Sequence, residues 1–159
     1  MKGVLILIIL LFVACNNASE QSGSNKIETK DTLKMPTTKD SIIKLEMHLS
    51  AYGVESDDFP FIDADIDFTT DSAWCRKSYY NPKYKDSIYT LDKHEIRNVL
   101  RILQNANLEK LKKEYKVLRT DQPTSTIIIF TQKQKFEIKD YGLEGDYPLQ
   151  ELYKIVYKL

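Results

Sequence analysis

The chain of 159 residues is poor in the residues that carry most enzyme chemistry, with only two cysteines and two histidines. A catalytic thiol needs a histidine beside it, and neither His48 nor His94 lies in a recognisable motif. Cys75 falls on the apolar side of a predicted strand, which favours the role of a small buried hydrophobe. We therefore expect no catalytic residue, no metal ion and no cofactor.

The chain also lacks an excess of charge of either sign, because Lys and Arg together number 23 and Asp and Glu together number 23. The lysines are scattered along the sequence rather than clustered in a patch. A nucleic-acid-binding domain usually shows a basic surplus gathered on one face. We therefore expect no nucleic-acid partner.

A third absence is an apolar run long enough to cross a bilayer, which takes about twenty residues. The longest run, from Val4 to Val13, follows Lys2 and ends at Ala14 and Cys15. A short apolar run after a positive start is typical of a secretion signal. The sequence therefore predicts a cleaved signal over residues 1–14.

Cys15 directly follows a small residue, and this arrangement resembles the lipobox of bacterial lipoproteins. That pattern usually has Leu and a small residue where this chain has Phe12 and Val13. The resemblance implies a diacylglycerol on the Cys15 sulfur, cleavage before it, and a membrane partner reached through the lipid. Asn16 follows the cysteine, and this favours the outer membrane over the inner membrane. The alternative is an ordinary signal peptide with a chance cysteine.

The stretch after Cys15 is rich in Ser, Thr, Asn and Lys and has almost no apolar periodicity. Such a composition cannot bury enough apolar surface to fold, so residues 15–40 are predicted to be a flexible tether. Residues 41–159 are expected to form a single domain, a size that suits one hydrophobic core.

Residues 61–68, FIDADIDF, place aspartates at every second position, at Asp63, Asp65 and Asp67. A calcium loop counted from Asp63 needs glycine at its sixth position and glutamate at its twelfth, where this chain has Phe68 and Trp74. We expect no divalent-metal site tighter than about millimolar here. The alternation instead predicts a strand with one apolar face and one acidic face.

The segment after FIDADIDF reads as the turn and return strand of a hairpin. Closure around Asp71 and Ser72 would place Asp67 opposite Arg76, which pairs an acid with a base across the strands. The same register would place Phe68 opposite Cys75.

Other strands follow from alternation and β-branched content. IIKLEMHLS should direct Ile43, Leu45, Met47 and Leu49 to one face, and a short strand is expected near Ser87–Tyr89. A second hairpin is predicted within PTSTIIIFTQKQKFEIKDYG, with its turn at residues 132–134.

Two helices are also predicted. LDKHEIRNVLRILQNAN has Asp92 as N-cap and Glu95 completing a capping box, followed by the apolar stripe Ile96, Val99, Leu100, Leu103. A final helix begins near Pro148. LEKLKKEY is a candidate for a further short helix. The expected class is α+β, a mostly antiparallel sheet of about five to six strands with two helices on one face.

The segment from Ile42 to the end resembles an uncharacterised domain family of Gram-negative lipoproteins, one of the numbered domains of unknown function. The likeness lies in FTTDSAW, TDQPTSTIIIF and IKDYG. Many family members carry a cysteine pair around Gly-Thr in the loop after the first strand. This chain has YGVESDD at residues 52–58 and no cysteine there. The resemblance implies a fold and supplies no activity.

The stretch SYYNPKYKDSIY gathers several tyrosines and lysines, and we expect Tyr79 in the core. The candidate partner-binding residues are Tyr80, Tyr84, Lys83 and Lys85. Exposed tyrosines stack on sugars or anchor protein partners at low entropic cost. The alternative is that these rings only cover a hairpin edge, in which case the loop from Ala51 to Phe59 is the next candidate.

Three classes of function remain open on this sequence. The favoured one is a lipid-anchored cell-envelope module without catalytic activity, which binds a protein or glycan. A periplasmic immunity or inhibitor protein is the second, since it needs only a shaped surface. A hydrolase using the FIDADIDF aspartates or Asp57 and Asp58 is the third, and it would need a carboxylate in an apolar pocket.

Overall fold

The computed structural model of the chain describes residues 40–54 and 56–159. The predicted signal, Cys15 and the tether up to residue 39 lie outside the described residues.

The described residues form a single seven-stranded sheet in the order β4-β3-β2-β1-β6-β7-β5. Neighbouring strands are antiparallel except β5 and β7, which are parallel. The α+β prediction is confirmed, with β5 as the strand that sequence reasoning missed. The strands are β1 (Ile42–Ser50), β2 (Phe61–Asp67), β3 (Ser72–Ser78), β4 (Ser87–Tyr89), β5 (Glu114–Lys116), β6 (Thr124–Thr131) and β7 (Lys135–Tyr141).

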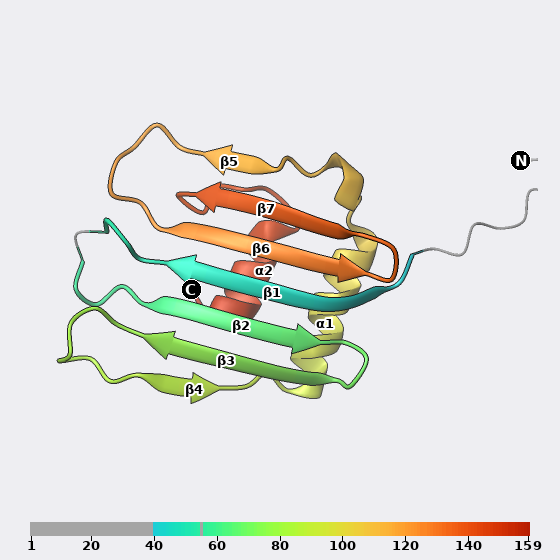
Figure 1. Cartoon of the computed structure of the whole chain (residues 1–159), viewed down its shortest axis with the longest axis horizontal. Coiled ribbons are helices and arrows are strands. Elements are labelled where there is room, and N and C mark those ends of the chain that lie inside the picture. Colours follow the sequence, from blue (N-terminus) through green and yellow to red (C-terminus); the bar gives the residue numbers. More distant parts are fainter. Residues whose placement is uncertain (1–39, 55) are drawn as a thin grey trace, which may run out of the picture. The chain divides into compact units, whose positions relative to one another are not determined.

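Both helices cover the same face of the sheet (Figure 1). They are α1 (Lys93–Asn105) and α2 (Leu149–Leu152), and α2 continues into a π-helical turn, η2 (Tyr153–Tyr157). The segment LEKLKKEY, a candidate for a further short helix, forms only a short 3-10 turn, η1 (Leu108–Lys110). Within the described residues, no helix has the length and apolar character needed to cross a membrane.

Helix α1 begins where its capping box predicts. The Asp92 carboxylate accepts hydrogen bonds from the backbone N–H groups of His94 and Glu95, both at 2.8 Å, and the Glu95 carboxylate accepts one from Asp92 N at 2.8 Å. Three of the four residues of the predicted apolar stripe are buried, and Ile102 is buried in place of Leu100. The helix therefore packs with its apolar side on the sheet.

The alternation in FIDADIDF is confirmed, because Ile62, Ala64 and Ile66 are buried while the aspartates lie on the opposite face. The register predicted for the hairpin is wrong. Asp67 lies opposite Ser72, and Arg76 lies opposite Asp63.

The turn chemistry explains this register. The Asp67 carboxylate accepts from the Thr69 hydroxyl at 2.6 Å and from the backbone N–H groups of Thr69 and Thr70 at 2.7 and 3.2 Å. These bonds, led by the Thr69 hydroxyl, hold the pKa of Asp67 below its usual value. They close the turn earlier than expected, and Asp71 takes the left-handed conformation at φ 51°. Within the two strands the predicted faces are kept, because Ile62, Ala64, Ile66 and Cys75 are all buried.

The first residues of β1 do not follow the simple alternation of buried and exposed side chains. Ile42 pairs with Thr131 and Lys44 with Phe130, so the strand bulges at Ile43. As a result Ile42, rather than Ile43, packs against the core. The expectation that Ile43 shares the core face is therefore wrong, whereas Leu45, Met47 and Leu49 are buried as predicted.

Buried polar bonds fix the C-terminal helix on the sheet. Asp140, which is fully buried, accepts from the Tyr153 hydroxyl at 2.7 Å and from the backbone N–H groups of Glu144 and Gly145 at 3.1 and 2.8 Å. A Cβ at position 145 would lie 2.8 Å from the Asp140 carboxylate, so only glycine fits. Ser125 and Tyr157 share a further bond of 2.8 Å.

Candidate functional site

The tyrosine stretch predicted to meet a partner forms the loop between β3 and β4. Tyr80 is 88 % exposed, and Lys83 and Lys85 are exposed as well. Tyr84 is half-buried against Tyr79, with ring centroids 5.3 Å apart. Tyr79 is also half-buried and stands outside the core cluster, so its predicted core position is wrong.

Tyr80 lies beside the loop that follows β1, which was the fallback candidate. Asn81 Nδ2 donates to Asp57 Oδ2 at 2.9 Å and so ties the two loops together. Between them is a pocket of about 250 Å³, which we call the tyrosine cleft. It is lined by Ala51, Tyr52, Gly53, Val54, Ser56, Asp57, Phe59, Phe61 and Tyr80.

The tyrosine cleft combines exposed aromatic surface with acceptors. Tyr52 is 88 % exposed, like Tyr80, and Asp57 supplies a carboxylate. The chain can place Tyr52 there because Gly53 turns the backbone at φ 87°. Exposed rings next to a carboxylate suit a sugar or a polar peptide, which stacks on the rings and donates hydrogen bonds.

A third exposed loop joins these two at the same end of the sheet. Residues 117–123 lead into β6, whose first residue, Thr124, pairs with Ser50 at the end of β1. Leu118 in this loop is fully exposed, and Arg119 beside it is exposed too. Figure 1 shows the connections β1–β2, β3–β4 and β5–β6 at one end of the sheet. We call this end the loop end.

Sequence reasoning found Tyr80 and named the loop from Ala51 to Phe59 that contains Tyr52, but it did not single out Tyr52 and missed Leu118. Residues in irregular loops carry no periodic signal. The one available signal is the Gly53 turn next to Tyr52. Their common position depends on strand pairing between segments that are far apart in the sequence.

The aspartates of FIDADIDF have local partners on the face of the sheet opposite the helices. Asp63 lies 2.9 Å from His48 Nδ1, and Asp65 lies 2.7 Å from Lys44 Nζ. The bond to Asp65, with a second to Glu46, raises the pKa of Lys44 above its usual value. Across residues 40–54 and 56–159, no three His, Cys, Asp or Glu side chains are grouped as a metal site requires.

The other residues weighed for catalysis lie apart. Cys75 is fully buried on the core face, and burial raises the pKa of its thiol to about 11. His48 lies on the opposite, exposed face, so the sheet separates the two. Asp57 accepts from Asn81 and Asp58 from the Ser56 hydroxyl, both at the surface.

One comparison with known proteins gives a match. The model of a family described as "Domain of unknown function (DUF6438)" matches residues 58–159, so β1 lies outside the matched region. No curated protein and no solved structure matches the chain.

Proposed function

The chain belongs to the DUF6438 family, a domain of unknown function, and from that premise we propose that it is a lipid-anchored binding module of the bacterial cell envelope. The proposed anchor is Cys15, the proposed membrane is the outer membrane of a Gram-negative cell, and the proposed partner is a protein or glycan held at the loop end.

The observation that carries this proposal is that exposed Tyr52 and Tyr80 line one pocket, at the end of the sheet where the loop with exposed Leu118 also lies. Exposed large apolar side chains that gather on one surface mark interaction sites more often than scattered ones do. Tyrosine in particular contributes large contact area at low entropic cost.

The position of Asp40 gives the proposal a direction. Asp40 precedes β1, and the loop end follows it, so the nine residues of the strand separate them. At about 3.3 Å per residue this separation is about 30 Å. The chain from Cys15 therefore enters the domain at the end of β1 opposite the loop end.

The anchor is tested by labelling cells with an alkyne fatty acid. We expect the protein to take up the label and Cys15→Ser to remove it. A label that persists in Cys15→Ser, or an unlabelled parent protein, contradicts the anchor and leaves the binding surface to be judged separately.

The binding surface is tested by affinity capture from envelope extracts with the full chain in a non-ionic detergent. Tyr52→Ala combined with Tyr80→Ala should lower the recovery of a captured partner at least tenfold. Tyr80→Ala with Tyr84→Ala should lower it less, because Tyr84 is half-buried against Tyr79.

The matched control is Trp74→Ala, which removes a ring that is 46 % exposed on β3, outside the loop end. Thermal melting checks that each variant is folded. If the Tyr52 and Tyr80 variant captures the partner as well as the parent does, the loop end is not the site.

A further inference from the structure

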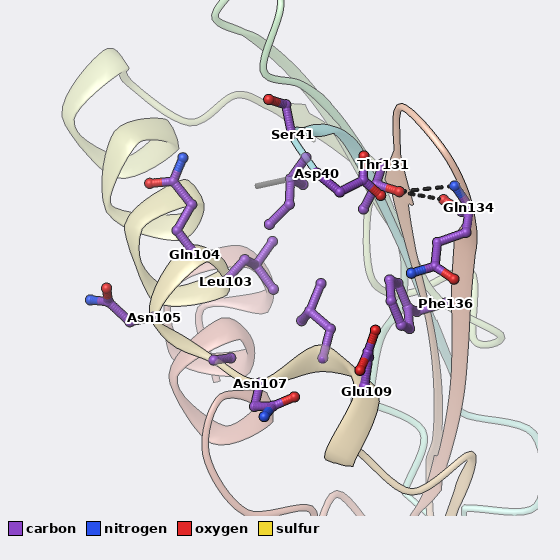
Figure 2. A pocket seen from close by; sticks show the side chains of 13 residues that line it. Asp40, Ser41, Leu103, Gln104, Asn105, Asn107, Glu109, Thr131, Gln134 and Phe136 are labelled. Carbon is purple, nitrogen blue, oxygen red and sulfur yellow. Dashed lines mark hydrogen bonds between the residues drawn. The ribbon is translucent and has the colours of Figure 1, made fainter. Parts of the chain in front are cut away.

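The tyrosine cleft differs from the larger pocket at the other end of β1 in its aromatic lining. Four of the residues that line the cleft carry rings: Tyr52, Phe59, Phe61 and Tyr80. The larger pocket, of about 550 Å³, has Phe136 as its one ring, among polar side chains such as Gln104 and Thr131 (Figure 2). The concentration of rings is therefore a feature of the cleft and bears on what it binds.

The size and polar groups of the cleft suit a single side chain. Its volume of about 250 Å³ lies below the range of small-molecule sites, about 300–1,000 Å³. The Ser56 hydroxyl already donates to Asp58, and Asp57 Oδ2 already accepts from Asn81. Asp57 Oδ1 and the tyrosine hydroxyls are the side-chain groups that remain in the described lining. A sugar, with a hydroxyl on most of its carbons, needs more polar partners than this.

The ring faces of the cleft are open to a cation from outside. Within residues 40–54 and 56–159, lysine ammonium groups lie 5.6 to 6.0 Å from the centroids of five other rings, in the pairs Lys44–Phe130, Lys77–Tyr79, Lys83–Tyr84, Lys112–Tyr115 and Lys158–Tyr89. Among these same residues, no cation lies over any of the four rings of the cleft. Tyr52 and Tyr80 are each 88 % exposed, so a partner can reach them.

The electrostatics of the cleft favour a positive ligand. Asp57 is the one charged side chain among the described lining residues, and none of them is Lys, Arg or His. The face of an aromatic ring is the negative part of its quadrupole and attracts cations. The carboxylate and the ring faces therefore act with the same sign.

The two loops that form the cleft are held in place by their own hydrogen bonds. Val54 N donates to Ala51 O at 3.0 Å, and Tyr84 N donates to Asn81 O at 3.1 Å. The bond of 2.9 Å from Asn81 to Asp57 joins one loop to the other. A site formed in advance loses less conformational entropy when it binds.

Among cationic side chains, arginine matches these features most closely. Its guanidinium is planar and weakly hydrated, stacks on aromatic faces, and presents its N–H groups as a fork that suits a carboxylate. The lysine ammonium is compact and more strongly hydrated, so it gains less from an open ring face. We propose that the tyrosine cleft receives the guanidinium of an arginine side chain from a protein partner, with Asp57 as its counter-ion. This inference rests on the proposed function, because it names what the loop end takes from its partner.

The test is a nuclear magnetic resonance titration of the full chain, in a non-ionic detergent, with the peptide acetyl-Gly-Arg-Gly-amide at constant ionic strength. The amide resonances of Gly53, Val54 and Tyr80 should shift and saturate. The same peptide with citrulline in place of arginine, which has a neutral urea of nearly the same shape, should bind at least tenfold more weakly. The lysine peptide should bind at least threefold more weakly.

Variants then assign the contacts. Asp57→Asn should weaken binding of the arginine peptide at least fivefold, and its amide oxygen still accepts from Asn81, which keeps the loops joined. Asp58→Asn removes the neighbouring carboxylate, which is not part of the lining, and should change binding less than twofold. Tyr52→Leu should bind at least fivefold more weakly than Tyr52→Phe, because phenylalanine keeps the ring face.

Several results would overturn the proposal. They are no saturable binding of the arginine peptide, equal binding of the citrulline peptide, binding of the lysine peptide as tight as that of arginine, or equal binding by Tyr52→Leu and Tyr52→Phe. Tighter binding of chitotriose, a trisaccharide of N-acetylglucosamine, at the same resonances would assign the cleft to a glycan instead. The peptide and sugar comparisons use only the parent protein, so they decide even if a variant fails to fold.

The outcome is separable from that of the capture experiment. A parent that captures a partner through Tyr52 and Tyr80 but does not bind the arginine peptide refutes the guanidinium site and keeps the proposed function. A parent that binds the arginine peptide through Asp57 but captures no partner supports the guanidinium site and contradicts the proposed function.

Discussion

At the scale of single residues, Asp140 is a buried polar side chain whose hydrogen bonds hold separate segments of the core together. Its carboxyl group accepts three hydrogen bonds while being fully buried, and it joins β7 to the segment before α2 and to Tyr153 in η2. Burial, followed by the bond to Asp140, raises the pKa of Tyr153 above its ordinary value. The pair therefore stays bonded throughout the neutral pH range.

We expect Asp140→Ala to lower the free energy of unfolding by about 3 kcal/mol, because two backbone N–H groups and a tyrosine hydroxyl would lose their acceptor in the core. Tyr153→Phe should cost less, since it removes one donor and keeps the ring. Urea unfolding followed by circular dichroism measures both. Asp146→Ala, at an exposed position, is the control and should change stability by less than about 0.5 kcal/mol. A similar loss in both aspartate variants would contradict the role given to Asp140.

At the scale of elements, α1 shows what short-range sequence signals can predict. Its N-cap and capping box are local, and both are present in the structure. Asp92→Ala should therefore speed hydrogen exchange at the His94 and Glu95 amides, which lose their acceptor, and lower the urea midpoint. Asp71→Asn, which alters a turn aspartate but suits its left-handed backbone, should leave exchange at these two amides unchanged. Unchanged exchange in Asp92→Ala would show that packing alone fixes the first turn.

The β2–β3 hairpin shows where local signals fail. Alternation fixed which side of the strand each residue faces, but the register depended on three hydrogen bonds to the Asp67 side chain. Strand β5 has only three residues and pairs in parallel with β7, so its existence depends on a distant partner. The bulge at Ile43 likewise depends on how β6 pairs with β1.

The tyrosine cleft was hidden from the sequence for the same reason. Tyr80 could be picked out as an exposed tyrosine, but its neighbour Tyr52 comes from another loop. The cleft has no motif, because it is a product of strand order.

At the scale of the whole molecule, the buried ionisable groups of the core predict how the fold responds to alkaline pH. Burial is the main cause of a raised pKa at Cys75, where it is about 11, and at Tyr89, Tyr153 and Tyr157. In the unfolded chain a cysteine and a tyrosine ionise near their ordinary pKa values, about 8.5 and 10. As pH rises, the unfolded chain therefore releases protons that the folded chain retains, and unfolding becomes more favourable.

The contribution of these groups to stability is thus fully present at neutral pH and falls progressively above about pH 9, first through Cys75 and then through the tyrosines. We expect the urea midpoint, followed by circular dichroism, to decrease steadily between about pH 8.5 and 11. Cys75→Ala should remove the earliest part of the decrease, whereas Tyr52→Phe, at an exposed ring, should not change its slope. A midpoint that stays constant up to about pH 10.5 would mean that these side chains reach solvent in the folded protein, and the packing of α2 and η2 on the sheet would then need revision.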